Sequence, residues 1–161
     1  MRRAVLAPLL ATLLPLLLIM LCLPAGAQAP TVMGVWLTAS KSAEIRLAPC
    51  ADAAHGPVCG TVIRLIDPKD ADGKAMVPDQ VTDLHNADPK LRERKVIGMV
   101  LLYDFKTSPA PNAYEGGTIY NGENGKTYNA TLGLQADGTL RLRGYVGSPL
   151  LGETQIWTRV Q

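Results

Sequence analysis

Eight short segments of this chain have the length and alternation of β-strands, and turns rich in Gly and Asn separate them. The segments are 34–38, 43–48, 58–66, 96–105, 113–121, 126–135, 139–146 and 153–160. No long stretch has the periodicity of an amphipathic helix. Eight short strands with inward and outward alternation predict an all-β fold, either an antiparallel barrel or a strongly curved sandwich.

The clearest alternation lies in segment 126–135. Its apolar positions Tyr128, Ala130, Leu132 and Leu134 alternate with Thr, Asn and Gly residues, so one face is apolar. Asp137-Gly138 follows this segment, and this dipeptide is typical of a tight hairpin turn. We therefore expect segments 126–135 and 139–146 to pair as a hairpin.

The two ends of the strand-rich region carry an informative pair of residues. Trp36 lies in the first segment and Arg159 in the last. A closed antiparallel barrel brings its first and last strands together, because closure removes both sheet edges. We assign both residues a structural role and expect them to meet at one barrel end, with the guanidinium against the ring face.

The first 27 residues have the pattern of a signal peptide. Two arginines precede an almost wholly apolar run, and Ala25-Gly26-Ala27 is a small-x-small cleavage site. Cleavage there leaves residues 28–161 as a single domain, long enough to build its own core. An uncleaved membrane anchor is the alternative, because the apolar run approaches the length of a span. We favour an exported protein, periplasmic or secreted, without a transmembrane span after cleavage.

The charge of the chain argues against some classes of partner. The full sequence has 16 Lys and Arg residues and 14 Asp and Glu residues. Two of the basic residues lie in the signal peptide, so the mature chain carries 14 of each sign. Nucleic acid or an anionic membrane surface would select a strongly basic protein. The sequence therefore gives no electrostatic reason to expect a nucleic-acid partner.

Two of the three cysteines remain after cleavage of the signal peptide. Cys50 and Cys59 each lie at the end of a strand-like segment, nine residues apart. In an oxidising compartment such a pair is typical of a disulfide that closes a loop. We expect this bond, and not a redox-active pair, because the spacing is not C-x-x-C.

Residues 67–95 interrupt the strand pattern with a polar stretch that holds three prolines and six aspartates. Long loops in compact domains are often lids or binding loops. Asp88-Pro89 predicts a short helix over Lys90 to Arg94, with Asp88 as its N-cap. We expect residues 83–94 to be ordered and residues 69–78 to be mobile.

From Trp36 onward the chain resembles the domain of unknown function 2147 family, which comprises small exported bacterial proteins. The matching stretches are Gly34-x-Trp36, Cys50…Cys59-Gly60, Asp83-x-x-Asn86-x-Asp88-Pro89-x-Leu91-Arg92-x-Arg94, Ile97-Gly98, Gly116-Gly117-x-Ile119-Tyr120, Gly125-Lys126-Thr127-Tyr128, Leu140-x-Leu142-Arg143-Gly144-Tyr145-Val146-Gly147 and Leu151-Gly152-x-Thr154-Gln155-x-Trp157-x-Arg159. The family is similar to calycin-type barrels such as lipocalins, which also join a Gly-x-Trp to a late arginine. The resemblance implies an eight-stranded antiparallel calycin-like barrel and no particular activity.

The sequence contains none of the common catalytic or metal-binding motifs, so we assign no catalytic residue, no metal ligand and no cofactor. His85, flanked by acidic residues, is a candidate base or ligand contact, or it simply faces water. Arg92 and Arg94 are candidates to bind a ligand carboxylate or phosphate, or one of them pairs with a loop aspartate and holds the loop down. Tyr103 and Tyr128 are candidates to give an apolar pocket a polar end, or they are ordinary strand residues.

Two hypotheses about function follow from these patterns. The first is a binding module for a small apolar or amphiphilic ligand, with Tyr103, Tyr128, His85 and Arg92 at the site. The alternative is an envelope protein-interaction or inhibitor module without an internal ligand, which contacts its partner through the exposed turn at Leu150 and Leu151. An enzyme is the third class, and would need His85 to line a cleft beside an acidic neighbour.

Overall fold

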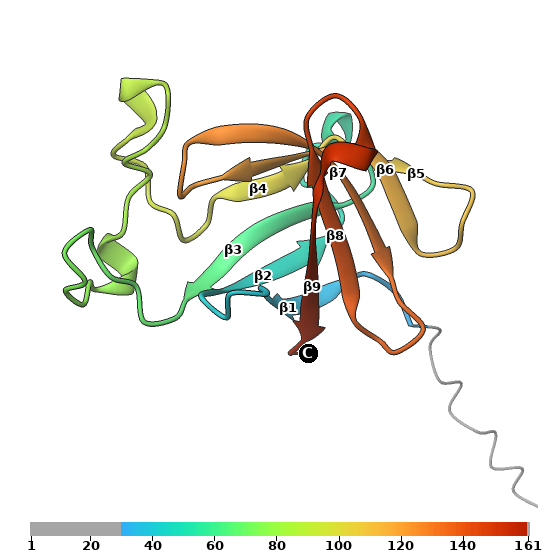
Figure 1. Ribbon diagram of the computed structural model, residues 1–161, viewed down its shortest axis with the longest axis horizontal. Helices are drawn as coiled ribbons and strands as arrows, with labels where there is room; N and C mark the ends of the chain where they lie inside the picture. Colours follow the sequence, from blue (N-terminus) through green and yellow to red (C-terminus); the bar gives the residue numbers. More distant parts are fainter. Residues whose placement is uncertain (1–29, 161) are drawn as a thin grey trace, which may run out of the picture.

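The computed structural model describes residues 30–160, so the expected signal peptide lies outside the described part of the chain (Figure 1). No helix among the described residues is long and apolar enough to cross a membrane. The strands are β1 (Gly34–Leu37), β2 (Ala43–Ala48), β3 (Cys59–Leu65), β4 (Val100–Tyr103), β5 (Lys106–Thr107), β6 (Ala113–Asn121), β7 (Lys126–Leu134), β8 (Leu140–Tyr145) and β9 (Glu153–Arg159). Single turns of 3-10 helix are η1 (Ala53–His55), η2 (Pro78–Gln80), η3 (Pro89–Leu91) and η4 (Pro149–Leu151).

The strands form one antiparallel sheet that closes on itself (Figure 1). The strand order is β4-β3-β2-β1-β9-β8-β7-β6-β5, and a further pairing between β4 and β6 joins the two ends. The two-residue β5 pairs with β6 beyond the end of β4, so eight strands form the wall. The predicted eight-stranded antiparallel barrel is confirmed.

The hairpin expected around Asp137-Gly138 is present between β7 and β8. Gly138 has a φ of 82°, which favours glycine. The Asp137 carboxylate accepts a hydrogen bond of 2.9 Å from the backbone N–H of Thr139. The two strands then pair in register from Leu134 opposite Leu140 to Asn129 opposite Tyr145.

The predicted strand 96–105 is too long at both ends. The ladder begins only at Val100, because Gly98 has a φ of 91° and Met99 closes a turn onto Val96. It stops at Asp104, whose φ of 61° interrupts the extended backbone before β5 resumes. At these positions the positive φ angles interrupt the extended backbone, and alternation of apolar residues does not reveal them.

The pair of residues at the two ends of the chain meets as expected. β1 and β9 pair with Trp36 opposite Arg159, and the guanidinium carbon lies 4.2 Å from the centre of the Trp36 ring. Trp36 is fully buried, and its indole N–H donates to the carbonyl of Val32. The Arg159 guanidinium donates to the carbonyls of Thr31 and Met33. These contacts fix the segment before β1 across this end of the barrel.

The loop between β2 and β3 covers the same end of the barrel. The expected disulfide joins Cys50 to Cys59 across a sequence separation of nine residues. Phe105 is buried and packs on Gly117 of β6, where a side chain would lie within 2.2 Å of its ring. One end of the barrel is therefore closed by packed side chains.

Candidate functional site

The opposite end of the barrel opens into a cavity of about 880 Å³. Its rim is formed by the β1–β2, β3–β4, β6–β7 and β8–β9 connections, all of which lie at this end. Its floor is apolar and consists of inward residues from five strands: Ile45, Val62, Ile119, Leu142 and Trp157. The barrel therefore holds an apolar space that opens to solvent at one end only.

The strand register explains why side chains fill the middle of the barrel and leave a cavity nearer its open end. Leu142 of β8 lies between Leu132 of β7 and Gln155 of β9, and both leucines are almost fully buried. One inward position nearer the mouth, Ala130 of β7 faces Gly144 of β8. These two residues are the smallest available, so they leave space that leucines fill in the level below.

Polar side chains line the part of the cavity between its apolar floor and its mouth. On β9, Trp157, Gln155 and Glu153 occupy successive inward positions toward the open end, and all three line the cavity. The Trp157 indole N–H donates to Gln155 Oε1 at 2.9 Å. Across the cavity, the Tyr128 hydroxyl accepts a hydrogen bond of 2.9 Å from Asn124 Nδ2. The cavity thus has an apolar floor and a polar mouth.

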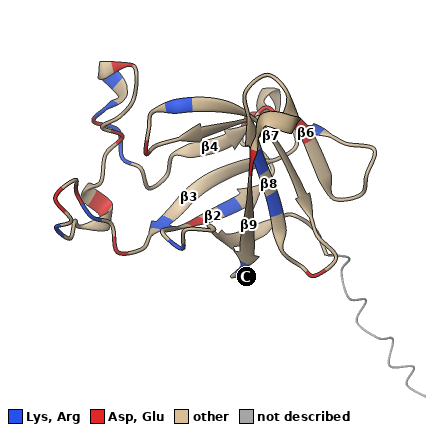
Figure 2. Ribbon diagram, viewed as in Figure 1, with Lys and Arg blue, Asp and Glu red and all other residues tan. Residues whose placement is uncertain are grey.

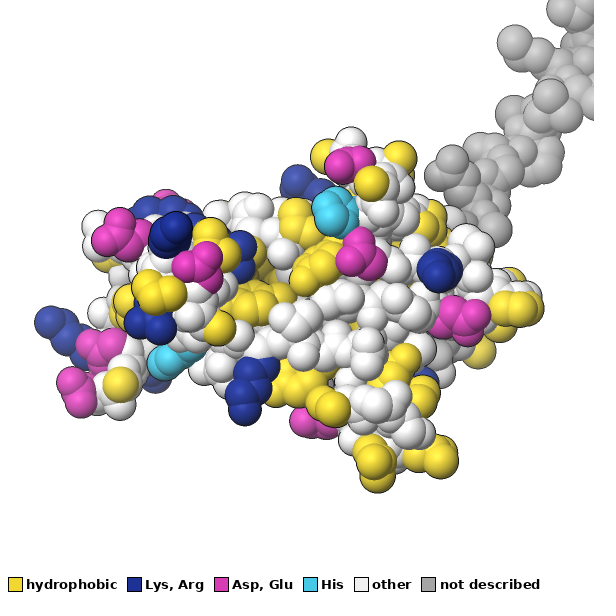
Figure 3. All heavy atoms as spheres, turned by 90° about the horizontal axis from the view of Figure 1, so that it is seen from above, with side chains coloured by type: hydrophobic (Ala, Val, Ile, Leu, Met, Phe, Trp, Pro, Cys, Tyr) yellow, Lys and Arg dark blue, Asp and Glu magenta, His cyan; other side chains and the backbone are white. Residues whose placement is uncertain are grey.

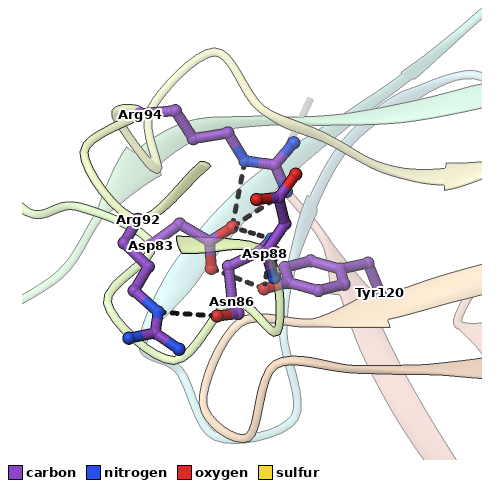
Figure 4. A network of polar contacts seen from close by, with 6 residues as sticks. All are labelled: Asp83, Asn86, Asp88, Arg92, Arg94 and Tyr120. Atoms are coloured by element: carbon purple, nitrogen blue, oxygen red, sulfur yellow. Dashed lines mark hydrogen bonds and ion pairs between the residues drawn. The ribbon is translucent and has the colours of Figure 1, made fainter. Parts of the chain in front are cut away.

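The loop between β3 and β4 is held against the barrel by a buried carboxylate (Figure 4). Asp83 is 1% exposed and accepts hydrogen bonds from Arg94 Nε at 2.9 Å, from the Tyr120 hydroxyl at 2.6 Å and from Asn86 Nδ2 at 2.7 Å. The Arg94 guanidinium also lies 5.3 Å from the centre of the Tyr120 ring. Burial raises the pKa of Tyr120, and its hydrogen bond to Asp83 acts in the same direction. We call Asp83, Asn86, Arg94 and Tyr120 the latch.

The latch organises the backbone of the residues around it. Asn86 Oδ1 accepts from the N–H of Asp88, and Asp88 in turn caps η3 by accepting from the N–H of Lys90. The carbonyl of His85 lies so close to Gly125, in the β6–β7 turn, that a Cβ there would come within 1.8 Å of it. The loop therefore sits directly on this turn and brings Leu84 and His85 to the cavity rim.

The outer part of the loop forms a small hairpin of its own. Lys69 pairs with Ala75, and the Asp70 carboxylate accepts from the backbone N–H groups of Asp72 and Lys74. Acidic and basic residues both occur along this segment, which extends away from the barrel (Figure 2). Within residues 30–160, no three His, Cys, Asp or Glu side chains come together as a metal site would require.

Two of the four ligand-binding candidates line the cavity, and two do not. Tyr128 lies on its wall and His85 on its rim. Arg92 lies outside it, because its Nε donates to the carbonyl of Asn86 at 2.8 Å. Tyr103 is also outside, with its ring 5.9 Å from the ring of His55. The sequence interpretation did not single out Gln155 and Glu153, although alternation along β9 from the apolar Trp157 predicts that both face inward.

A second polar pair lies away from the cavity, where η1 meets the β4–β5 junction. His55 Nδ1 lies 2.7 Å from Asp104 Oδ1, and the backbone N–H of Asp104 donates to the carbonyl of His55. The hydrogen bond to Asp104 raises the pKa of His55, with partial compensation from desolvation. Both side chains are about half exposed, so the pair fastens the disulfide-containing loop to the barrel surface.

A closed eight-stranded antiparallel barrel with one packed end and one open cavity defines a lipocalin-like protein. The chain belongs to the bacterial family described as "Uncharacterized protein conserved in bacteria (DUF2147)", which matches residues 34–159. Its structure is similar to that of protein HP1028 from the human pathogen Helicobacter pylori, described as belonging to the lipocalin family. The two share 25% sequence identity with a TM-score of 0.62, over 83% of this chain and 85% of that one. No curated protein matches this chain.

Proposed function

We propose that this protein is an exported binding module that carries a small apolar or amphiphilic ligand in the barrel cavity. The observation that carries the proposal is the cavity itself, with its apolar floor and polar mouth. Its volume of about 880 Å³ falls in the range of about 300–1,000 Å³ that is usual for small-molecule sites. Tyr128 and His85 are positioned to contact the polar part of the ligand, whereas Tyr103 and Arg92 are not part of this proposal.

Two observations support export. The N-terminal 27 residues have the pattern of a signal peptide. The Cys50–Cys59 disulfide suits an oxidising compartment such as the periplasm or the extracellular space. The protein would then meet its ligand outside the cytoplasm.

Titration with the neutral fluorescent probe N-phenyl-1-naphthylamine tests the proposal. We expect saturable binding with one probe per chain. Gly144→Val should weaken it, because a side chain at this inward position takes up part of the space that the cavity offers. Gly133→Val is the matched control: it is also a β-strand glycine with ordinary space around its Cβ, but it lies outside the cavity. Absence of binding, or equal binding by both variants, would contradict the proposal.

A second candidate function is protein interaction, and one observation favours it. Hydrophobic side chains are visible on the molecular surface (Figure 3), and Leu150 and Leu151 in η4 are 89% and 81% exposed. Exposed leucines side by side are typical of contact sites. A pull-down from envelope extract with the wild type and with Leu150→Ser/Leu151→Ser distinguishes the two. A stoichiometric partner lost only in the double variant would support the interaction module.

A further inference from the structure

The charges around the cavity are unequal. Four carboxylates line it, from Asp67, Asp70, Glu123 and Glu153, whereas Lys69 is the only lysine or arginine among the lining residues. The Lys69 ammonium lies 3.5 Å from the Asp67 carboxylate, so its charge is already balanced within the protein. A ligand that enters the mouth therefore meets a net negative field.

Glu153 is the carboxylate that lies on the barrel wall itself. It continues the inward row of Trp157 and Gln155 toward the mouth, and it faces Gly144 on the neighbouring strand. Its carboxylate has no ion-pair or hydrogen-bond partner among residues 30–160. Glycine opposite it leaves room, so a ligand whose apolar part fills the floor brings its polar part close to this carboxylate.

The arginines that would attract an anionic ligand are bound elsewhere. Arg94 is held by Asp83 in the latch, and Arg92 by the carbonyl of Asn86. Arg143, on β8, points outward and donates to the carbonyl of Pro149 and the hydroxyl of Thr154. None of the three lines the cavity, so a carboxylate or phosphate on the ligand would find no free guanidinium there.

We propose that the cavity selects amphiphiles with a cationic polar end, of the ammonium or amine type, over amphiphiles with an anionic end. This inference rests on the proposed function, because it assigns the charge of the ligand in the same cavity. The apolar chain lies among Ile45, Val62, Leu142 and Trp157, and the cationic group lies at the level of Glu153. Selectivity comes from opposite charge at the mouth and from the lack of a free guanidinium among the lining residues, where the one lysine already pairs with Asp67.

Displacement of bound N-phenyl-1-naphthylamine by three dodecyl amphiphiles tests the inference at neutral pH, low salt and concentrations below micelle formation. The three are dodecyltrimethylammonium, the neutral dodecyldimethylamine N-oxide, and dodecanoate, which share one chain and differ in charge. We expect dodecyltrimethylammonium to bind at least about tenfold more tightly than dodecanoate, as a close charge contact near a protein surface implies. Added salt should reduce this ratio.

Glu153→Gln is the decisive variant, because it removes the charge and keeps the shape. The preference for the cation should fall several-fold in this variant. Glu115→Gln is the matched control: it removes an exposed carboxylate on β6 that lies outside the cavity, and should leave the ratio unchanged. If the protein binds the probe, but binds dodecanoate as tightly as dodecyltrimethylammonium or more tightly, the charge preference is wrong and the proposed function is unaffected. Failure of the probe and of all three amphiphiles would overturn the proposed function as well.

Discussion

At the scale of single residues, two contacts tie distant parts of the chain together at well-defined atoms. Trp36 and Arg159 join the first and last strands, and the arginine also bonds the two carbonyls that precede β1. His55 and Asp104 join the disulfide-containing loop to the β4–β5 junction. The first pair is built on a fully buried ring and the second is half exposed, so they should contribute very differently to stability.

Replacement of Trp36 by alanine should destabilise the protein by about 3–5 kcal/mol, because it removes a buried ring and leaves a cavity in its place. The stacked arginine would also lose its aromatic partner. Urea unfolding followed by circular dichroism measures the effect. A loss below about 1 kcal/mol would show that this contact does not hold the barrel closed.

The His55–Asp104 pair should make stability depend on pH. The pKa of His55 is raised above its ordinary value of 6.5 in the folded protein, chiefly by the hydrogen bond to Asp104. Its contribution is therefore fully present below the unfolded pKa and is lost as the pH rises through the folded pKa. Unfolding of the wild type and of Asp104→Asn should differ more at about pH 5.5 than at about pH 8.5. A difference that grows with pH would contradict this assignment.

At the scale of elements, the loop between β3 and β4 consists of two parts with different contacts. Residues 83–94 are fastened by the latch and rest on the β6–β7 turn. Residues 69–78 form a hairpin that is mostly exposed. A buried, fully hydrogen-bonded carboxylate fixes its surroundings, whereas an exposed hairpin has few contacts to lose when it opens.

Hydrogen exchange should separate these two parts. We expect protected amides within 83–94, among them Asn86 and Arg94, whose N–H groups are internally bonded, and rapid exchange within 69–78. Asp83→Ala should abolish the protection of 83–94 and cost about 2–3 kcal/mol, since it leaves the Tyr120 hydroxyl and Arg94 without their acceptor. Strong protection throughout 69–78, or none in 83–94, would reverse the assignment.

The strands and hairpin turns were predictable from the sequence, because alternation and turn residues are local properties. The capping of η3 by Asp88 was predictable for the same reason, although the helix is shorter than the expected span over Lys90 to Arg94. The start of β4 and the existence of β5 were not, since they depend on positive φ angles at Gly98 and Asp104. Conformations of this kind are set by tertiary packing.

The site was predictable only in part. Alternation along β7 predicts that Tyr128 faces inward, and it lines the cavity, whereas its contact with a ligand stays a prediction. Of the two arginines, Arg94 makes the expected pair with a loop aspartate and Arg92 takes neither expected role, because the fold of an irregular loop decides which of them reaches the carboxylate. The cavity itself arises where Ala130 pairs with Gly144. The strand register brings these two small residues together, and neither local sequence reveals it.

At the scale of the whole molecule, the barrel has one packed end and one open end. Trp36, Arg159, Phe105 and the disulfide loop close the first. The second opens into the cavity, and residues from both parts of the long loop lie along its rim. This division suits the proposed binding function: packed side chains close one end, and loops shape the cavity at the other.

Native mass spectrometry of the exported protein, purified gently and without detergent, tests most directly the central claim that the cavity holds a ligand. We expect a species heavier than the mature chain by one small molecule, which gas-phase activation releases and whose apolar part suits the barrel floor. The Gly144→Val variant should retain less of the adduct than the wild type, and Gly133→Val should retain it in full. A wild-type protein that carries no adduct, and takes up none when amphiphiles are added, would contradict the claim.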